Sequence, residues 1–200
     1  MKPCILAFEA SSDACTVALQ VKGEVYSKHV IEPRSHNELL LPIIQDLMKQ
    51  ANIGFADLDA IAFGAGPGSF VGVRIAASVV QGLAFAAQKP VIRLSSLQIM
   101  AQTAYRELGL SQIEIILDAR MKQYYFGQYE LSNGLMLSVE ADSIRPNVQN
   151  EVLPELVVLP NARDMLPLAE YCYVKGELLK PEQALPIYLD EAKQWKKLAT

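Results

Sequence analysis

The chain has 200 residues, of which 51% are hydrophobic and 20% are charged, and its formal net charge is −4. This balance is typical of a globular protein and excludes a disordered, collagen-like or coiled-coil chain. The 18 basic residues form no dense cluster, and nucleic-acid affinity depends mostly on concentrated Lys and Arg side chains. The composition therefore argues against a protein that binds nucleic acid on its own.

The first fifty residues predict a meander of three strands followed by a helix. We expect strands at residues 5–10, 15–21 and 24–30. The two-residue turn at 22–23 is typical of a hairpin. Apolar residues at helical spacing then predict a helix over residues 37–51.

Helices and strands alternate in the middle of the chain. We expect strands at 59–65, 91–94, 113–117 and 123–129, and helices at about 72–88 and 97–108, the second helix capped by Ser95 or Ser96 and stopped by Gly109. This order indicates an α/β protein with mixed strand pairing. Six of the 11 prolines fall after residue 145, which predicts short elements there. We therefore expect two lobes, an N-terminal one at residues 1–105 and a smaller, less regular one at 106–200.

One stretch, residues 60–88, contains Arg74 as its single charged residue. Glycines interrupt it before about 20 apolar residues accumulate, so we do not expect it to cross a membrane. Its helical part is apolar on nearly all sides and must be buried on nearly all sides. A layered α/β domain covers one face only, so the second lobe or another protein chain covers the other. We favour another chain, and we expect Val80 and Leu83 to face outward.

Two turns of small residues could form a phosphate-binding cleft. A carboxylate at a strand end can hold a metal ion or a phosphate, and a helix N-terminus attracts anions. The residues concerned are Glu9, Ser11 and Ser12 in the first turn and Gly66, Gly68 and Ser69 in the second. The second turn lacks the Gly-Lys-Ser/Thr ending of a Walker A loop. The alternatives are a hairpin turn with an exposed glutamate and a tight strand-to-helix connection with a serine cap.

No residue pattern predicts a catalytic or metal site. His29 and His36 are the only histidines, and apart from Glu38 beside His36 neither has a further ligand-type residue at metal-binding spacing. Three cysteines fit no redox spacing and the N-terminus has no leader pattern, so we expect reduced thiols in the cytoplasm. Asp118 and Arg120 follow a strand and could act in a functional loop, although we favour a turn that they close by pairing with each other.

Together these segments resemble the TsaB (YeaZ) family of bacterial tRNA threonylcarbamoyladenosine biosynthesis proteins. The most specific block is Gly-Pro-Gly-Ser-Phe at residues 66–70, followed by Gly72 and Arg74. The other similar segments are residues 5–11, 34–42, 57–61, 82–84, 95–97, 118–121 and 186–189.

The resemblance implies an actin-like and Hsp70-like ATPase (ASKHA) fold, with two ribonuclease H-like lobes of which the second is shortened. It implies a non-catalytic scaffold in the formation of N6-threonylcarbamoyladenosine at position 37 of tRNAs that read ANN codons. The expected partners are the paralogous transferase TsaD, the ATPase TsaE and a second copy of the chain, with tRNA bound only within the complex and no membrane. ATP or ADP and a metal are expected on partner subunits, and no cofactor on this chain.

The resemblance also implies a partner interface on the two early helices. The expected interface residues are Leu39, Leu40, Ile43, Leu47, Arg74, Ala76, Val80 and Leu83. Leu40 stands where the paralogue TsaD has the second histidine of a metal-binding pair. Glu9, Ala10 and Val71 stand where the family commonly has Asp, Thr and Thr, which removes or displaces short polar groups in the predicted cleft. The alternative function is a free-standing ATPase or small-molecule kinase, whereas a peptidase lacks any visible set of nucleophile, base and metal ligands.

Overall fold

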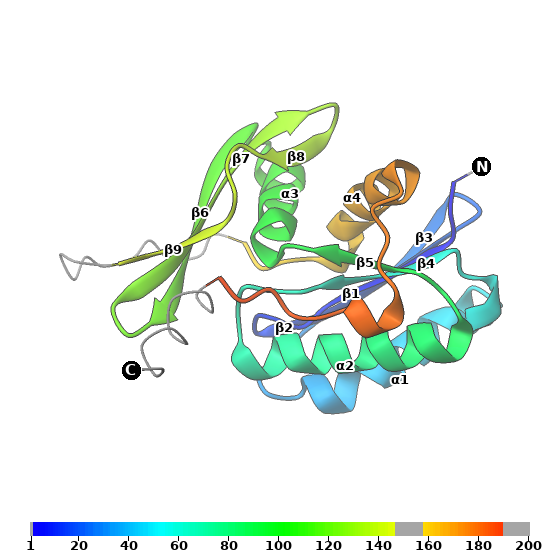
Figure 1. Cartoon of the computed structure of the whole chain (residues 1–200). Helices are drawn as coiled ribbons and strands as arrows, with labels where there is room; N and C mark the ends of the chain where they lie inside the picture. The colour runs from blue at the N-terminus through cyan, green and yellow to red at the C-terminus, as the bar shows by residue number, and fades with distance from the viewer. Residues whose placement is uncertain (1, 147–157, 190–200) are drawn as a thin grey trace.

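The computed structural model describes residues 2–146 and 158–189, which form two β-sheets and four α-helices (Figure 1). The first sheet contains β1 (Ile5–Glu9), β2 (Ala14–Val21), β3 (Glu24–Ile31), β4 (Ala60–Gly64) and β5 (Val91–Leu94). The second sheet contains β6 (Gln112–Arg120), β7 (Gln123–Ser132), β8 (Leu135–Ser138) and β9 (Ser143–Pro146). The helices are α1 (His36–Gln50), α2 (Phe70–Ala87), α3 (Ser96–Leu108), α4 (Ala162–Lys175) and two short 3-10 helices, Phe55–Asp57 and Pro181–Gln183.

The first sheet is mixed and has the strand order β3-β2-β1-β4-β5. β1 pairs antiparallel with β2 and parallel with β4, so the chain leaves β1 and β4 at the same edge of the sheet. Every residue of β1, β2 and β4 is buried. β1 and β4 can therefore carry nearly continuous apolar runs instead of an alternating pattern, because helices cover both faces.

Helices cover both faces of the first sheet (Figure 1). α1 and α2 pack on one face, where Leu6, Ile44 and Phe63 belong to the largest apolar cluster. α4 packs on the other face, where Ile5 and Met165 belong to a second cluster. The middle of this sheet is thus the core of the protein.

The second sheet is antiparallel and smaller. β7 pairs with β6, with β8 at one end and with β9 at the other. α3 packs against this sheet through a third apolar cluster that includes Met100, Tyr129 and Met136. The Asp142 carboxylate accepts hydrogen bonds from the Tyr129 hydroxyl at 2.5 Å and from the hydroxyl of Ser95, so the loop after β8 is tied to the start of α3.

The turn between β6 and β7 confirms a prediction. Arg120, Met121 and Lys122 all have left-handed backbone angles, with φ of 68°, 48° and 60°. The Asp118 carboxylate accepts a hydrogen bond from the backbone N–H of Arg120 at 2.8 Å and lies 3.8 Å from the Arg120 guanidinium. The two residues therefore close the turn by pairing with each other.

The elements predicted up to β7 are confirmed, with ends that differ by three residues or fewer. Ser95 caps α3 as expected, because its hydroxyl accepts from the backbone N–H of Leu97 at 3.2 Å. Gly109 ends the helix with a φ of 71°. β8, β9 and α4 were not predicted.

The predicted division at residue 105 differs from the observed packing. α4 lies in the second half of the sequence, yet it packs on β1 and β2 of the first sheet. The backbone N–H of Ala162 donates to Thr16 Oγ1 at 3.0 Å. Leu179 pairs with Val91 of β5 through two backbone hydrogen bonds of 2.8 and 2.9 Å. Residues 162–189 therefore complete the first unit, and the second consists of β6–β9 with α3.

Candidate functional site

The two predicted phosphate loops meet at one edge of the first sheet. They follow β1 and β4, whose parallel pairing places both turns side by side. The backbone N–H of Ser69 donates to the carbonyl oxygen of Ser11 at 2.7 Å. The Ser69 hydroxyl accepts from the backbone N–H of Gly72 at 3.3 Å and so caps α2. The loops are therefore bonded directly to each other.

Glu9 is fully buried between these loops. Its carboxylate accepts hydrogen bonds from the backbone N–H of Ser11 at 2.5 Å and from the Ser96 hydroxyl at 2.6 Å. The Ser96 oxygen accepts from the Ser11 hydroxyl at 2.9 Å and from the backbone N–H of Gly66 at 3.1 Å. A hydroxyl has one donor and two acceptor positions, so Ser96 is fully engaged. Sequence reasoning considered Ser96 only as a helix cap and missed its role in this network.

Glycines allow the loops to pack this closely. A Cβ atom at Gly64 would lie 1.7 Å from Glu9 Oε2, and one at Gly72 would lie 1.9 Å from the carbonyl oxygen of Ala10. Both distances are far below van der Waals contact, so no side chain fits at either position. At Gly68, which belongs to the predicted phosphate loop, a Cβ atom would lie 2.5 Å from the carbonyl oxygen of Ser11, so this glycine also accommodates atoms of the chain itself.

The described residues contain no group of three or more His, Cys, Asp or Glu side chains that could hold a metal ion. His36 is buried at the start of α1, and its Nε2 has no hydrogen-bond partner within the described ranges. Leu40 lies in the apolar core. Burial, and secondarily the Glu9 carboxylate, raises the pKa of the Cys15 thiol to about 11, so this cysteine is protonated at neutral pH. That the chain has no cofactor of its own stays a prediction.

Most of the residues predicted for the partner interface lie on the buried sides of α1 and α2. Five of the eight expected residues are buried in the core beneath α1 and α2, namely Leu40, Ile43, Leu47, Ala76 and Val80. Val80 has no exposed surface, so the expectation that it faces outward is wrong. These residues recur at helical spacing because they face the sheet. Spacing alone does not distinguish the inner from the outer face of a helix that is apolar on both.

The outer face of α2 is apolar and exposed. Val71, Ser78, Gly82 and Phe85 follow one another at helical spacing along this face, which we call the α2 outer face. The exposed fractions of Val71 and Phe85 are 63% and 77%. A Cβ atom at Gly82 would have no atom within 4 Å. The face thus has two large apolar residues near its ends and small residues between them, an arrangement that admits close approach of another chain.

The remaining expected interface residues, Leu39, Arg74 and Leu83, are half-buried. Arg74 is held within the chain, because its guanidinium carbon lies 3.3 Å from the centre of the Phe70 ring and Nη1 donates to the Phe70 carbonyl at 2.8 Å. The only charge of α2 is therefore turned toward its own helix.

By length and composition alone, α2 could also cross a membrane, and 33% of its residues are buried in the protein. Its inner face packs on β4 and β1. This packing ties the helix to the first sheet, and the expectation that the stretch does not cross a membrane stays a prediction.

Residues 178–189 form an extended segment beside α2, which we call the C-terminal strap (Figure 1). The carbonyl oxygen of Ala184 accepts from Gln81 Nε2 at 3.0 Å, and the backbone N–H of Ile187 donates to the carbonyl oxygen of Ala65 at 2.8 Å. The strap therefore follows α2 from its end back to the loop before it. In the sequence, only the Pro-Ile-Tyr-Leu motif at residues 186–189 pointed to this segment.

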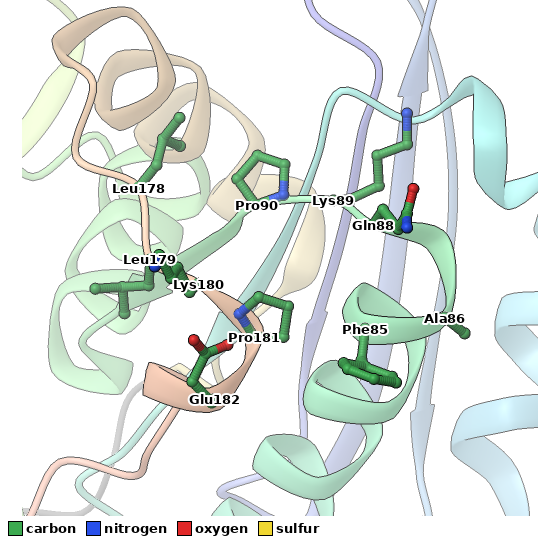
Figure 2. A pocket seen from close by; sticks show the side chains of 10 residues that line it. All are labelled: Phe85, Ala86, Gln88, Lys89, Pro90, Leu178, Leu179, Lys180, Pro181 and Glu182. Carbon is green, nitrogen blue, oxygen red and sulfur yellow. The ribbon is translucent and has the colours of Figure 1, made fainter.

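A cavity of about 650 Å³ lies between the end of α2 and the strap. Figure 2 shows the Phe85 ring beside Pro181 and below Pro90, with Glu182 on the strap side. Because Phe85 also belongs to the α2 outer face, the cavity extends that face toward the strap.

Comparisons with known proteins agree with this geometry. A sequence model described as TsaD: tRNA N6-adenosine threonylcarbamoyltransferase matches residues 27–150. The chain is 34% identical to the tRNA threonylcarbamoyladenosine biosynthesis protein TsaB of Escherichia coli (strain K12), over 97% of each protein. It is 31% identical to TsaB of Haemophilus influenzae, over 97% of this chain and 96% of that protein. The solved structure of YeaZ from Pseudomonas aeruginosa is 40% identical, with a TM-score of 0.87 over 94% of this chain and 100% of the other.

The chain belongs to the TsaB (YeaZ) family. The predicted family and the predicted actin-like ASKHA fold are both confirmed. In this TsaB-family chain the loops at the carboxyl ends of β1 and β4 are bonded to each other, and α2 has an exposed apolar face.

Proposed function

We propose that this chain is a non-catalytic scaffold in the formation of N6-threonylcarbamoyladenosine at position 37 of tRNAs that read ANN codons. It binds and activates the transferase TsaD, and it helps TsaE and tRNA to engage the complex. The names of its relatives, TsaB biosynthesis proteins of this tRNA modification, support the role in the modification. The bonded loop pair at Ser11 and Ser69 is the observation that carries the non-catalytic role.

Three backbone N–H groups of the two loops already donate hydrogen bonds within the chain, which argues against nucleotide chemistry on this chain. A phosphate-binding loop needs backbone N–H groups that point at the ligand and are free to donate. Here the N–H groups of Ser11, Gly66 and Ser69 donate to Glu9, Ser96 and Ser11 of the same chain. The Glu9 carboxylate has no exposed surface with which to meet a metal ion.

The α2 outer face supports TsaD binding. Exposed apolar residues that lie together on one helix face are typical of a protein interface, and Val71 and Phe85 are among the most exposed apolar residues of the chain. The small residues Ser78 and Gly82 between them allow a partner helix to approach closely, by analogy with small-residue helix pairs. TsaD is a suitable partner because the model described as TsaD also matches this chain, so the two proteins have comparable helices to pair.

The proposal is tested by reconstitution. Purified TsaD, TsaE and substrate tRNA are incubated with and without the chain, and the modified nucleoside is measured by mass spectrometry. We expect the modification to require the chain, and isothermal titration calorimetry to detect its binding to TsaD. Full modification in its absence, together with no heat of binding, would refute the proposal.

The alternative of a free-standing ATPase or kinase makes a different prediction. A ligand that binds only the folded state raises the melting temperature. We expect Mg-ATP to leave the melting temperature of the isolated chain unchanged, because the N–H groups of Ser11, Gly66 and Ser69 already donate within the chain. A saturable rise with Mg-ATP that disappears in a Glu9→Gln variant would favour the alternative.

A further inference from the structure

Arg74 is the single charged residue of α2, and it lies at the border of the α2 outer face. It comes three residues after Val71 and four residues before Ser78, and residues at these spacings are neighbours on a helix surface. The Arg74 side chain is half-buried, whereas Val71 and Ser78 are exposed. A partner that covers the α2 outer face therefore also removes water from the Arg74 guanidinium.

Two aromatic rings hold this guanidinium in place. Its central carbon lies 3.3 Å from the centre of the Phe70 ring and 5.2 Å from the centre of the Tyr188 ring on the C-terminal strap. Both rings are themselves exposed, Phe70 at 69% and Tyr188 at 40%, so the charge stays at the surface. A guanidinium that is ordered in advance loses less conformational entropy when it binds another group.

The Arg74 side chain has hydrogen-bond donors that the described part of the chain does not use. An arginine side chain carries five N–H donors and no acceptor. Nη1 donates to the Phe70 carbonyl oxygen at 2.8 Å. None of the ion pairs within residues 2–146 and 158–189 includes Arg74. Its positive charge is thus ordered by aromatic rings but not neutralised by a carboxylate of the described residues.

A covered guanidinium needs an acceptor from the partner. A charged group that is removed from water is costly unless it is paired and hydrogen-bonded. The planar fork of an arginine matches a carboxylate, with which it can form two parallel hydrogen bonds. Because the Phe70 ring contacts the flat face of the Arg74 guanidinium, the N–H groups at its edge can meet such a group.

We propose that Arg74, held by Phe70 and Tyr188, binds an aspartate or glutamate carboxylate of TsaD at the border of the α2 outer face. The surface of TsaD that meets Val71 and Phe85 then carries an acidic residue beside its apolar contacts. Phe70 and Tyr188 act as positioning residues for the guanidinium. This inference rests on the proposed function and adds the chemistry that TsaD presents to this chain.

The first test compares Arg74→Gln with the wild type in calorimetric titrations with TsaD. Truncating one member of a covered charge pair is strongly unfavourable, so we expect the affinity to fall by at least about 30-fold. The melting temperature should stay nearly unchanged, because the side chain is bonded only at the surface. The matched control is Arg163→Gln, at an exposed arginine of α4 on the other face of the first sheet (Figure 1), and it should retain wild-type affinity.

Two further measurements separate the charge pair from a purely structural role of Arg74. The wild-type affinity should fall more steeply than that of Arg74→Gln between about 50 and 500 mM NaCl, because salt screens the pair. Tyr188→Ala removes one of the two rings and should weaken binding about threefold. Tyr188→Phe keeps the ring and should restore the wild-type affinity.

A substitution scan identifies the acceptor. The Asp and Glu residues of TsaD are replaced one at a time by Asn and Gln. One of these variants should bind the wild-type chain more weakly without further weakening the binding of Arg74→Gln, as a double-mutant cycle requires for a direct pair. Asp190 and Glu191 follow Tyr188 closely in the sequence, so the double variant Asp190→Asn with Glu191→Gln tests a carboxylate of this chain and should keep wild-type affinity.

The outcomes distinguish this inference from the proposed function. No binding of TsaD by the wild-type chain would refute both. Wild-type binding that Arg74→Gln retains, an unchanged salt dependence, or a scan without a coupled TsaD carboxylate would refute the inference alone. The same holds if the effect of Arg74→Gln disappears in the Asp190→Asn, Glu191→Gln chain, because the carboxylate would then belong to this chain.

Discussion

α1 and α2 lie on the same face of the first sheet, but they present different surfaces to solvent. The outer side of α1 is mostly polar and includes Glu38, Asp46 and Lys49. The outer side of α2 is apolar and includes Val71 and Phe85. Both helices bury one apolar face against the sheet, so folding alone accounts for α1 but leaves one apolar face of α2 unexplained. The comparison supports the proposal that the second face of α2 binds a partner.

The largest expected effect is the difference in stability between charged substitutions on the inner and the outer face of α2. Val80→Asp places a carboxylate among buried apolar groups, so we expect a loss of about 4 kcal/mol or more in the free energy of unfolding. Ser78→Asp, on the outer face of the same helix, should change it by less than about 0.5 kcal/mol. Urea denaturation measures both. A Val80→Asp variant as stable as the wild type would show that this face is not the inner one.

The second prediction concerns the loop edge. A Cβ atom at Gly64 would clash with the Glu9 carboxylate, so Gly64→Ala should lower the free energy of unfolding by about 3 kcal/mol. Thermal and urea unfolding provide the measurement. If Gly64→Ala is neutral, the two loops do not pack as closely as described.

The sequence predicted the elements of the first sheet well, because the hairpin turn, the helical spacing and the caps of α3 are local signals. It did not predict α4 or the strap, whose places depend on contacts with β1 and α2 far away in the sequence. It suggested two apolar faces on α2 but assigned Val80 to the wrong one. It located both loops correctly but could not show that Ser96, from a third segment, closes the Glu9 network.

A smaller effect is expected where the α2 outer face meets the cavity. Phe85 is 77% exposed, so Phe85→Ser should leave the melting temperature nearly unchanged. Its affinity for TsaD should fall by about tenfold, as for a large apolar contact residue. Calorimetric titration measures the affinity, with Val25→Ser on β3 as the control that retains wild-type binding. Equal affinities of the Phe85→Ser variant and the wild type would exclude this end of the helix from the interface.

The smallest expected effect is a gain in stability. Gly82 is an exposed glycine within a helix and has open space around it, so Gly82→Ala should raise the free energy of unfolding by about 0.5–1 kcal/mol. Gly82→Ala is the matched control for Gly64→Ala, because the same change of side chain should raise the free energy of unfolding at one position and lower it at the other. A loss of stability would mean that the α2 outer face is packed within the isolated chain.

The most direct test of the α2 outer face uses Gly82→Glu. The new carboxylate points into open space, so the variant should fold with a melting temperature close to that of the wild type. It places a charge between Val71 and Phe85 at the centre of the proposed contact, and a charge buried there without a partner is costly. Calorimetric titration with TsaD should therefore detect no binding by the variant and clear binding by the wild type. Wild-type affinity of folded Gly82→Glu would contradict the assignment of this face to the partner.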